Sequence, residues 1–212
     1  LLESLETGRA PLVSFRIGGR PVDFRLQSCR RESGRTALTY NVVGQPLVVR
    51  LSVSLDPEYN VMSFGATINP TGTVEGRISE VRLLDLLVEH EDTDLSTTLR
   101  TITGGTVKHY SHKSFPPVTF RATDRLMRGH DIAKFSEETG RGSNEILPLW
   151  LYYTPEGGIW FGPEWQGCWA MELHRLPEYT FAAVKLQFLD FSIQQGEEVA
   201  LPNMVIGSFE GD

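Results

Sequence analysis

The most distinctive residues of the chain lie between positions 157 and 169, where Trp160, Trp165 and Trp169 fall within ten residues among several glycines. Tryptophan presents a flat apolar face with an N–H at its edge, which suits the C–H face of a sugar ring. Glycine lets a loop approach a ligand or a neighbouring domain closely. Together with Glu164, these residues predict a carbohydrate or interdomain contact, with Trp165 exposed at the centre of the turn. A simpler interpretation places Trp160 and Trp169 in the core of two hairpin-linked strands.

A second glycine-containing stretch, residues 140–145, precedes the apolar run that contains Trp150. Its Arg141 and Asn144 carry side chains able to hydrogen-bond a polyol or a neighbouring domain. The alternative is a turn, permitted by the glycines, that enters the next strand. Arg141 and Asn144 are therefore candidate contact residues.

No group of residues has the spacing of a metal or catalytic site. His109 and His112 are three residues apart, which on a strand sends their rings to opposite faces, and the acidic stretch 90–94 lacks the glycine and terminal glutamate of a calcium loop. Glycosidic cleavage needs two facing carboxylates about 5–9 Å apart, yet none of the 27 acidic residues is singled out by its surroundings. Motifs of serine hydrolases, zinc proteases and nucleotide-binding proteins are also missing. We expect no catalytic residue, no metal and no cofactor.

Charge and hydropathy argue against two classes of partner. A net charge of −7 and a pI near 5.3 oppose the counterion release that drives nucleic-acid binding. The densest basic patch, formed by Arg25, Arg30, Arg31 and Arg35, is interrupted by Glu32, and we expect it in a solvated turn. No apolar run approaches the ~20 residues that cross a bilayer. We expect neither a nucleic-acid nor a membrane partner.

The cysteines and the chain ends say little about the compartment. Cys29 and Cys168 are far apart and belong to no metal-binding pair, so two free thiols are expected. The chain begins without Met, shows no signal peptide and stops abruptly at Gly211-Asp212. We expect a soluble fragment of a parent protein that is either cytoplasmic or exported.

Alternation of apolar and polar residues predicts an all-β domain that spans residues 1–212. Every second residue from Leu47 to Leu55 is apolar, and Val61 to Asn69 repeats the pattern after a turn, which predicts an antiparallel pair. Residues 78–90 also fit a helical stripe, but the apolar run 83–88 and its context favour a strand buried on both faces. The polar stretch 125–143 is expected to be a long loop with a helical turn near residues 132–137. Further strands are expected at residues 13–17, 22–26, 36–43, 99–103, 118–123, 146–153, 158–161, 168–175, 180–188 and 205–209.

Three segments give the chain a resemblance to the N-terminal domain of glycoside hydrolase family 36 and related α-galactosidase-like enzymes. They are residues 140–144 before the strand that contains Pro148, the glycine and tryptophan segment 157–169, and the closing stretch 196–212. Gly142 and the Pro163-Glu164 pair depart from the family's usual residues. The agreement in order and spacing covers about residues 141–212.

The resemblance implies a large two-sheet antiparallel supersandwich, similar to galactose mutarotase, that precedes a (β/α)8 catalytic barrel. In that family the nucleophile and the acid/base are carboxylates of the barrel, which would lie beyond Asp212. The implied partners are the chain's own C-terminal catalytic barrel and an oligosaccharide, and the parent is a candidate homo-oligomer.

These observations favour a non-catalytic accessory domain of an α-galactosidase-like glycoside hydrolase, which supports the barrel and contributes to the sugar site. Two alternatives stay open. An autonomous carbohydrate-binding module requires an exposed Trp165. A mutarotase-like sugar epimerase requires a histidine acid and a glutamate base that converge in one concave site.

Overall fold

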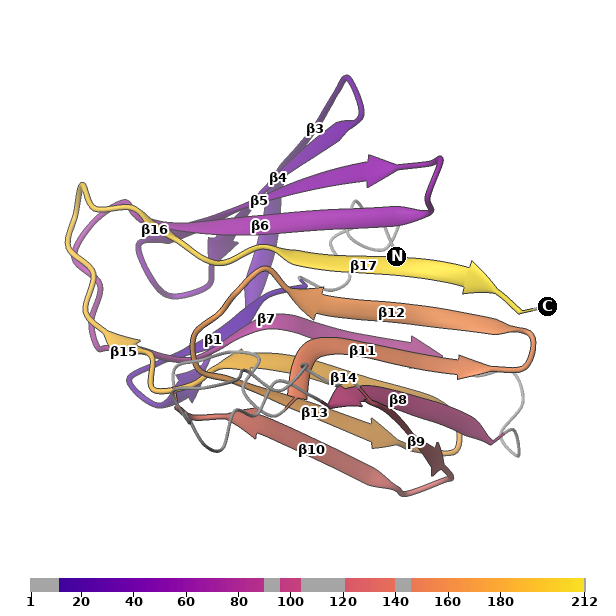
Figure 1. The fold of residues 1–212 in the computed structure, drawn as a ribbon. Coiled ribbons are helices and arrows are strands. Elements are labelled where there is room, and N and C mark those ends of the chain that lie inside the picture. Colours follow the sequence, from indigo (N-terminus) through magenta and orange to yellow (C-terminus); the bar gives the residue numbers. More distant parts are fainter. Residues whose placement is uncertain (1–11, 90–95, 104–120, 140–145, 212) are drawn as a thin grey trace, which may run out of the picture.

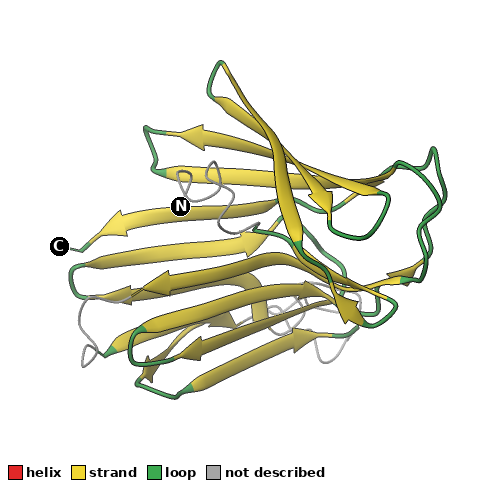
Figure 2. Cartoon of the chain, turned by 180° about the vertical axis from the view of Figure 1, so that it is seen from behind, coloured by secondary structure: helices red, strands yellow, loops and turns green. Residues whose placement is uncertain are grey.

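The chain forms two antiparallel sheets packed face to face, as the views from opposite sides in Figures 1 and 2 show. The computed structural model describes residues 12–89, 96–103, 121–139 and 146–211, and no helix occurs within these ranges. The expected all-β, two-sheet antiparallel sandwich is confirmed. The expectations for His109, His112 and residues 90–94, and part of the strand expected at 118–123, lie outside the described residues.

The larger sheet has ten strands. In order across the sheet they are β3 (Phe24–Glu32), β4 (Arg35–Val42), β5 (Leu47–Asp56), β6 (Val61–Pro70), β17 (Met204–Glu210), β12 (Gly157–Pro163), β11 (Ile146–Thr154), β8 (Thr97–Thr103) and β9 (Arg121–Met127), with β16 (Val199–Ala200) paired to β6. The expected pair at residues 47–55 and 61–69 is confirmed as β5 and β6.

The smaller sheet has seven strands. Their order is β10 (Ile132–Glu137), β13 (Trp169–Arg175), β14 (Tyr179–Leu186), β7 (Ile78–Glu89), β1 (Ser14–Ile17) and β2 (Arg20–Pro21), with β15 (Asp190–Phe191) paired to β7.

Aromatic side chains join the two sheets at the centre of the core. Trp169 of the smaller sheet packs edge-on against Trp150 of the larger sheet, with ring centroids 5.1 Å apart, and Phe161 lies 5.6 Å from Trp150. All three are fully buried. Beside them, the buried hydroxyl of Tyr152 lies 2.7 Å from those of Thr97 and Thr180, which belong to opposite sheets. Apolar contact and a satisfied polar bridge thus fix the sheets relative to each other.

Residues 78–89 form a strand, as expected, but the strand is not buried on both faces. The register of β7 against β14 shifts between Val184 and Lys185, so Leu83 and Leu84 are both buried although they are adjacent. Leu87 is exposed. The continuous apolar run therefore reflects a local bulge rather than a strand covered by two layers.

The expectation of a loop with a helical turn over residues 125–143 is wrong for residues 125–127 and 132–137, which form strands, and residues 140–143 lie outside the described ranges. β9 extends to Met127, and β10 is an edge strand that pairs with β13 along its whole length. In β10 only Ala133 and Glu137 are buried. Apolar and polar residues therefore barely alternate along β10. Pairing with the neighbouring strand, rather than the sequence of β10 itself, determines its conformation.

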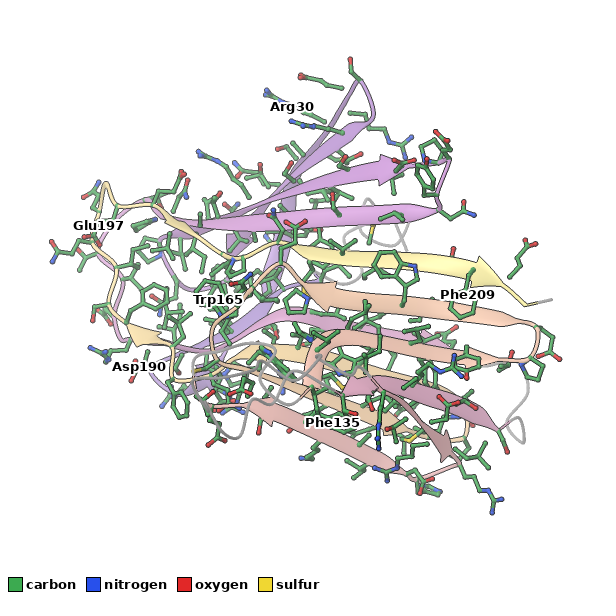
Figure 3. The ribbon with its side chains drawn as sticks, in the orientation of Figure 1. Arg30, Phe135, Trp165, Asp190, Glu197 and Phe209 are labelled. Carbon is green, nitrogen blue, oxygen red and sulfur yellow. The ribbon has the colours of Figure 1, made fainter. Side chains whose placement is uncertain are left out.

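The basic patch lies on strands and not in a turn as expected. Arg25, Arg30 and Arg31 belong to β3, and Arg35 begins β4. Only Ser33 and Gly34 form the turn between them, and both have positive φ. The arginine side chains are solvated, as predicted, because this hairpin projects from one edge of the larger sheet (Figure 3, Arg30).

Two of the connections between the sheets lie at the same end of the sandwich, on the left in Figure 1, and we call them the two crossovers. After β12 the chain passes through residues 164–168 to β13, and after β14 it returns through residues 187–203, which include β15 and β16, to β17. Because β12 pairs with β17, the start of the first crossover lies beside the end of the second.

Trp169→Ala is expected to lower the free energy of unfolding by about 3–5 kcal/mol, because a large aromatic side chain is removed from a site that cannot collapse. Urea denaturation followed by circular dichroism measures the change. Tyr59→Ala, at an aromatic residue that is 66% exposed, is the control and should change stability by about 0.5 kcal/mol or less. Equal losses in the two variants would contradict the role assigned to Trp169.

Candidate functional site

A groove of about 710 Å³ lies between the two crossovers. Its walls come from three short segments that are distant in sequence: the first crossover, the end of β14 with the residues that follow it, and the segment around β16. The lining residues are Glu164, Trp165, Gly167, Cys168, Leu186, Gln187, Phe188, Leu189, Val199, Ala200, Leu201, Pro202 and Asn203. We call this the crossover groove.

Hydrogen bonds between the crossovers hold the walls of the crossover groove. The Glu164 backbone N–H donates to the Asn203 carbonyl at 2.8 Å, which extends the β12–β17 ladder by one pair. The Asn203 side-chain Nδ2 donates to Glu164 Oε2, also at 2.8 Å. At the other end of the first crossover, the Gln187 backbone N–H donates to the Cys168 carbonyl. The groove is therefore preformed by backbone pairing.

Two aromatic side chains of the crossover groove are exposed. Trp165 is 41% exposed, which confirms the expectation for this residue, and its indole lies over Gly167 (Figure 3). Phe188 is 75% exposed and has φ +58°, a backbone conformation that bulky residues rarely adopt. Sequence analysis missed Phe188, because an aromatic residue just after a strand carries no local signal of exposure.

The other two tryptophans of the segment lie elsewhere. Trp169 is in the core, whereas Trp160 is half-buried on the outer face of the larger sheet, over Gly207 of the neighbouring strand. The interpretation that both fill the core of two hairpin-linked strands is wrong for Trp160 and for the connection, since β12 and β13 belong to different sheets. Neither residue lines the crossover groove.

Glycines of this segment, and Gly207 of the neighbouring strand β17, serve contacts within the chain. A Cβ atom on Gly167 would lie 2.5 Å from the Trp165 indole, and one on Gly207 would lie 2.2 Å from Nε1 of Trp160. A Cβ on Gly162 would lie 2.2 Å from the Pro148 carbonyl oxygen. Each is closer than atoms without a bond can approach, so these positions require glycine as they are now packed.

Few polar groups line the crossover groove. Within the described part of the chain, Glu164 is its only charged residue, and Asn203 and Gln187 supply its amides. Cys168 also lines it, and both Cys168 and Cys29 are free thiols, as expected. The candidate contact residues Arg141 and Asn144 lie outside the described residues, so the structure does not place them relative to the groove.

Further grooves lie among the described residues. One, of about 580 Å³, crosses the outer face of β4, β5 and β6 and shares Ala200, Leu201 and Asn203 with the crossover groove; we call it the sheet groove. Another, of about 390 Å³, lies at the β5–β6 turn and includes Asp56. Asn203 lies where the crossover groove and the sheet groove meet, since it lines both. Its Oδ1 lies over Gly65 of the sheet groove, 2.2 Å from the position that a Cβ atom on Gly65 would occupy.

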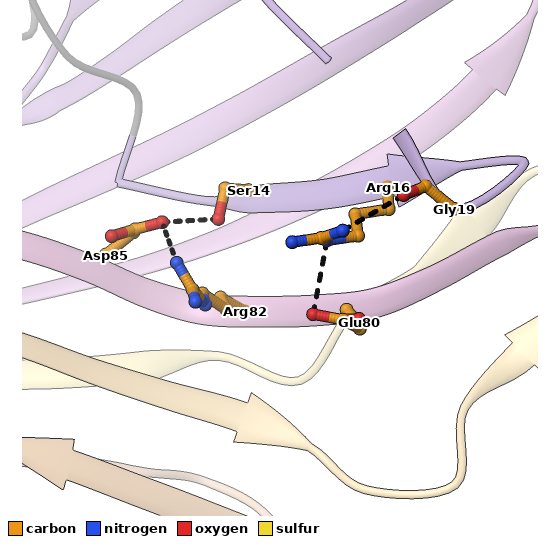
Figure 4. Close-up of polar contacts among 6 residues, drawn as sticks. All are labelled: Ser14, Arg16, Gly19, Glu80, Arg82 and Asp85. Carbon is orange, nitrogen blue, oxygen red and sulfur yellow. Dashed lines mark hydrogen bonds and ion pairs between the residues drawn. The ribbon is translucent and has the colours of Figure 1, made fainter. Parts of the chain in front are cut away.

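A network of polar side chains covers the outer face of the smaller sheet (Figure 4). The Ser14 hydroxyl donates to Asp85 Oδ2, which also accepts from Arg82 Nη1 at 3.1 Å. Arg16 pairs with Glu80 at 3.3 Å and donates to the Gly19 carbonyl. These bonds tie β1 to β7.

The network continues across the sheet to β13 and β10. Glu172 lies 3.0 Å from Lys134 Nζ and 3.7 Å from His174 Nε2. Burial by itself raises the pKa of Glu172, but hydrogen bonding and charge from Lys134, with the charges of His174 and Arg82, outweigh it and hold that pKa below its ordinary value of 4.5. Although His174 and Glu172 are close, neither lines any of the three grooves.

The described residues include neither a metal site nor a membrane-spanning helix. Among the described residues, no three His, Cys, Asp or Glu side chains gather as a metal site. The described ranges also contain no helix long and apolar enough to cross a membrane.

Gly167→Ala is expected to displace the Trp165 indole from its position, because the added methyl group would occupy the same space. The tryptophan emission maximum should shift to the red, and acrylamide should quench it more strongly. Gly129→Ala is the matched control, since its Cβ would meet nothing closer than Pro177 at 3.8 Å. The same shift in a Trp165→Phe background would show that another tryptophan causes it. This result would contradict the contact assigned to Gly167 and Trp165.

Glu172→Gln is expected to reduce the loss of stability in acid. A depressed folded-state pKa stabilises the fold above the ordinary value of 4.5, and this stability is lost as the pH falls through the folded-state pKa. Urea denaturation between about pH 6 and about pH 3 should show a smaller loss in Glu172→Gln than in the unmodified chain. Glu58→Gln, in the exposed β5–β6 turn, removes the same charge as a control. An identical pH dependence of the unfolding free energy in the unmodified chain and in Glu172→Gln would contradict the stabilising role of the Glu172 charge.

No protein-family model matches the sequence, and no curated protein sequence is similar to it. Several solved structures do share its fold. The galactosidase domain of the α-galactosidase-sucrose kinase AgaSK superimposes with a TM-score of 0.68 at 16% identity, over 96% of this chain and 30% of that one. The glycoside hydrolase family 36 α-galactosidase AgaA from Geobacillus stearothermophilus gives 0.68 at 13% identity, with the same coverage.

The α-galactosidase from Lactobacillus brevis gives a TM-score of 0.64 at 12% identity, over 96% of this chain and 29% of that one. The chain thus spans about 30% of the length of these enzymes. At such low sequence identity the structural likeness establishes the fold alone. The chain therefore has the two-sheet sandwich architecture found in one part of these larger α-galactosidases.

Proposed function

We propose that the chain is a non-catalytic accessory domain of an α-galactosidase-like glycoside hydrolase, which supports and orients a separate catalytic part. The observation that carries the proposal is the structural match, which covers 96% of this chain and only 30% of each of two α-galactosidase chains. A fold does not by itself imply a function. The proposal therefore also depends on the grooves and on the resemblance of residues 140–144, 157–169 and 196–212 to segments of that family.

The grooves favour a catalytic centre elsewhere in the parent enzyme. Hydrolysis of a glycosidic bond needs an acid and a second carboxylate on either side of the bond. Among the described residues, Glu164 is the one acid of the crossover groove, Asp56 is the one acid of the groove at the β5–β6 turn, and the sheet groove has none. A domain with this distribution fits a supporting role beside a catalytic barrel.

A second candidate function is an autonomous carbohydrate-binding module. The exposed Trp165 and Phe188 favour it, because aromatic side chains exposed in a groove are typical of sugar contact. This function differs from the first in that the domain works without a catalytic part. The epimerase alternative has less support, because neither His130 nor His174, the histidines of the described ranges, lines a groove.

Enzyme assays on two proteins test the leading proposal: the 212-residue chain and the product of the complete reading frame that encodes it. The complete product should hydrolyse p-nitrophenyl α-galactoside, and the 212-residue chain should not. Deleting the domain from the complete product should abolish soluble expression or lower its unfolding temperature by several degrees, because a packed neighbour is lost.

The assay also has outcomes that contradict the proposal. Hydrolysis by the 212-residue chain alone would show that the domain is itself catalytic. A reading frame that encodes no further domain would favour the autonomous module instead.

A further inference from the structure

We propose that the crossover groove and the adjoining sheet groove together bind a neutral oligosaccharide, with one sugar ring stacked on Trp165 and its hydroxyls held by Glu164 and Asn203. The inference rests on the proposed function, since it assigns the sugar contact of that domain to a defined surface. It is nevertheless tested separately, because binding does not require the catalytic part.

The crossover groove has the size and lining of a small-molecule site. Its volume of about 710 Å³ lies within the range of roughly 300–1,000 Å³ usual for such sites. Leu186, Leu189, Val199 and Leu201 supply apolar wall, and Trp165 and Phe188 supply exposed rings. A sugar ring has an apolar C–H face that such a lining can cover.

Phe188 is placed in the groove at the expense of a favourable backbone conformation. Its φ of +58° is in the left-handed region, and its side chain is 75% exposed. Core packing cannot account for either property, since the side chain remains in water. Strained residues that present a side chain to solvent concentrate at ligand contacts.

Glu164 and Asn203 supply the polar recognition. The Asn203 Nδ2–Glu164 Oε2 bond of 2.8 Å aligns a carboxylate with an amide next to Trp165. Within the described part of the chain, Glu164 Oε1 and the second Nδ2 hydrogen of Asn203 have no partner. An acceptor and a donor side by side match two neighbouring hydroxyls of a sugar, each of which can donate and accept.

The charge of the crossover groove selects against anionic ligands. Glu164 is its only charged residue in the described ranges, so a phosphate or a uronic acid would meet a like charge there without a compensating cation. A neutral saccharide meets no such penalty.

The two grooves together are long enough to accept more than one sugar. They meet at Asn203, which lies over Gly65, and beyond it Ser52, Ser63 and Thr67 line the sheet groove with hydroxyls. Two arginines, Arg35 and Arg50, also line the sheet groove, and Arg50 donates to Asn69 at 2.8 Å. A chain of sugars that starts on Trp165 can therefore continue over the small hydroxyl side chains of the sheet groove, beside its two arginines.

Calorimetric titration of the 212-residue chain with galactose-, glucose- and mannose-configured saccharides of one to four units tests the inference. At least one series should bind, with affinity that rises with length. Trp165→Ala and Asn203→Ala should each weaken binding by about tenfold or more, as expected for residues central to a contact. Tyr59→Ala, which removes an exposed aromatic residue outside both grooves, should leave the affinity unchanged.

A charged ligand tests the role of Glu164. Galacturonic acid, a single ring that occupies the crossover groove, should bind more weakly than galactose, and Glu164→Gln should reduce that difference. Unfolding midpoints of all variants check that each remains folded.

Failure of every neutral saccharide to bind at millimolar concentration would overturn the inference, and so would binding that Trp165→Ala leaves intact. The proposed function would stand in either case, because hydrolysis by the complete product decides it independently.

Discussion

Packing of Trp169 against Trp150 is the contact on which the arrangement of the two sheets depends. It joins a strand of the smaller sheet to a strand of the larger one with ring centroids 5.1 Å apart, and Phe161 of the larger sheet lies 5.6 Å from Trp150. Because Phe161 and Trp169 are only eight positions apart in sequence, the residues between them must pass from one layer to the other. A layer separation of about 10 Å leaves those residues at the end of the sandwich, outside the core.

The candidate site follows from that constraint. Residues 164–168 cross to the smaller sheet, residues 187–203 cross back, and the Glu164–Asn203 and Cys168–Gln187 backbone bonds join the two passages. Arg77 pairs with Asp190 at 2.7 Å and fixes the second passage to the connection between β6 and β7. Exposed aromatic residues on such passages are held by a rigid scaffold, which is how loops acquire recognition surfaces.

The comparison with α-galactosidases separates fold from function. Sandwiches with 12–16% identical residues superimpose with TM-scores of 0.64–0.68, because alternation of apolar side chains and strand pairing tolerate extensive substitution. The same tolerance means that the fold alone does not identify a ligand. The proposed functions therefore depend on particular residues, above all Trp165, Phe188, Glu164 and Asn203.

The sequence by itself determined most of the strands, since apolar alternation at residues 47–55 and 61–69 is strong enough to specify a half-buried strand. It also predicted the exposure of Trp165. It could not predict β10, whose few buried residues leave its conformation to β13, or the side chains of Phe188 and Asn203 in the groove. Those two residues meet Trp165 only because two crossovers come together, and contacts between residues more than 20 positions apart leave no periodic signal in the local sequence.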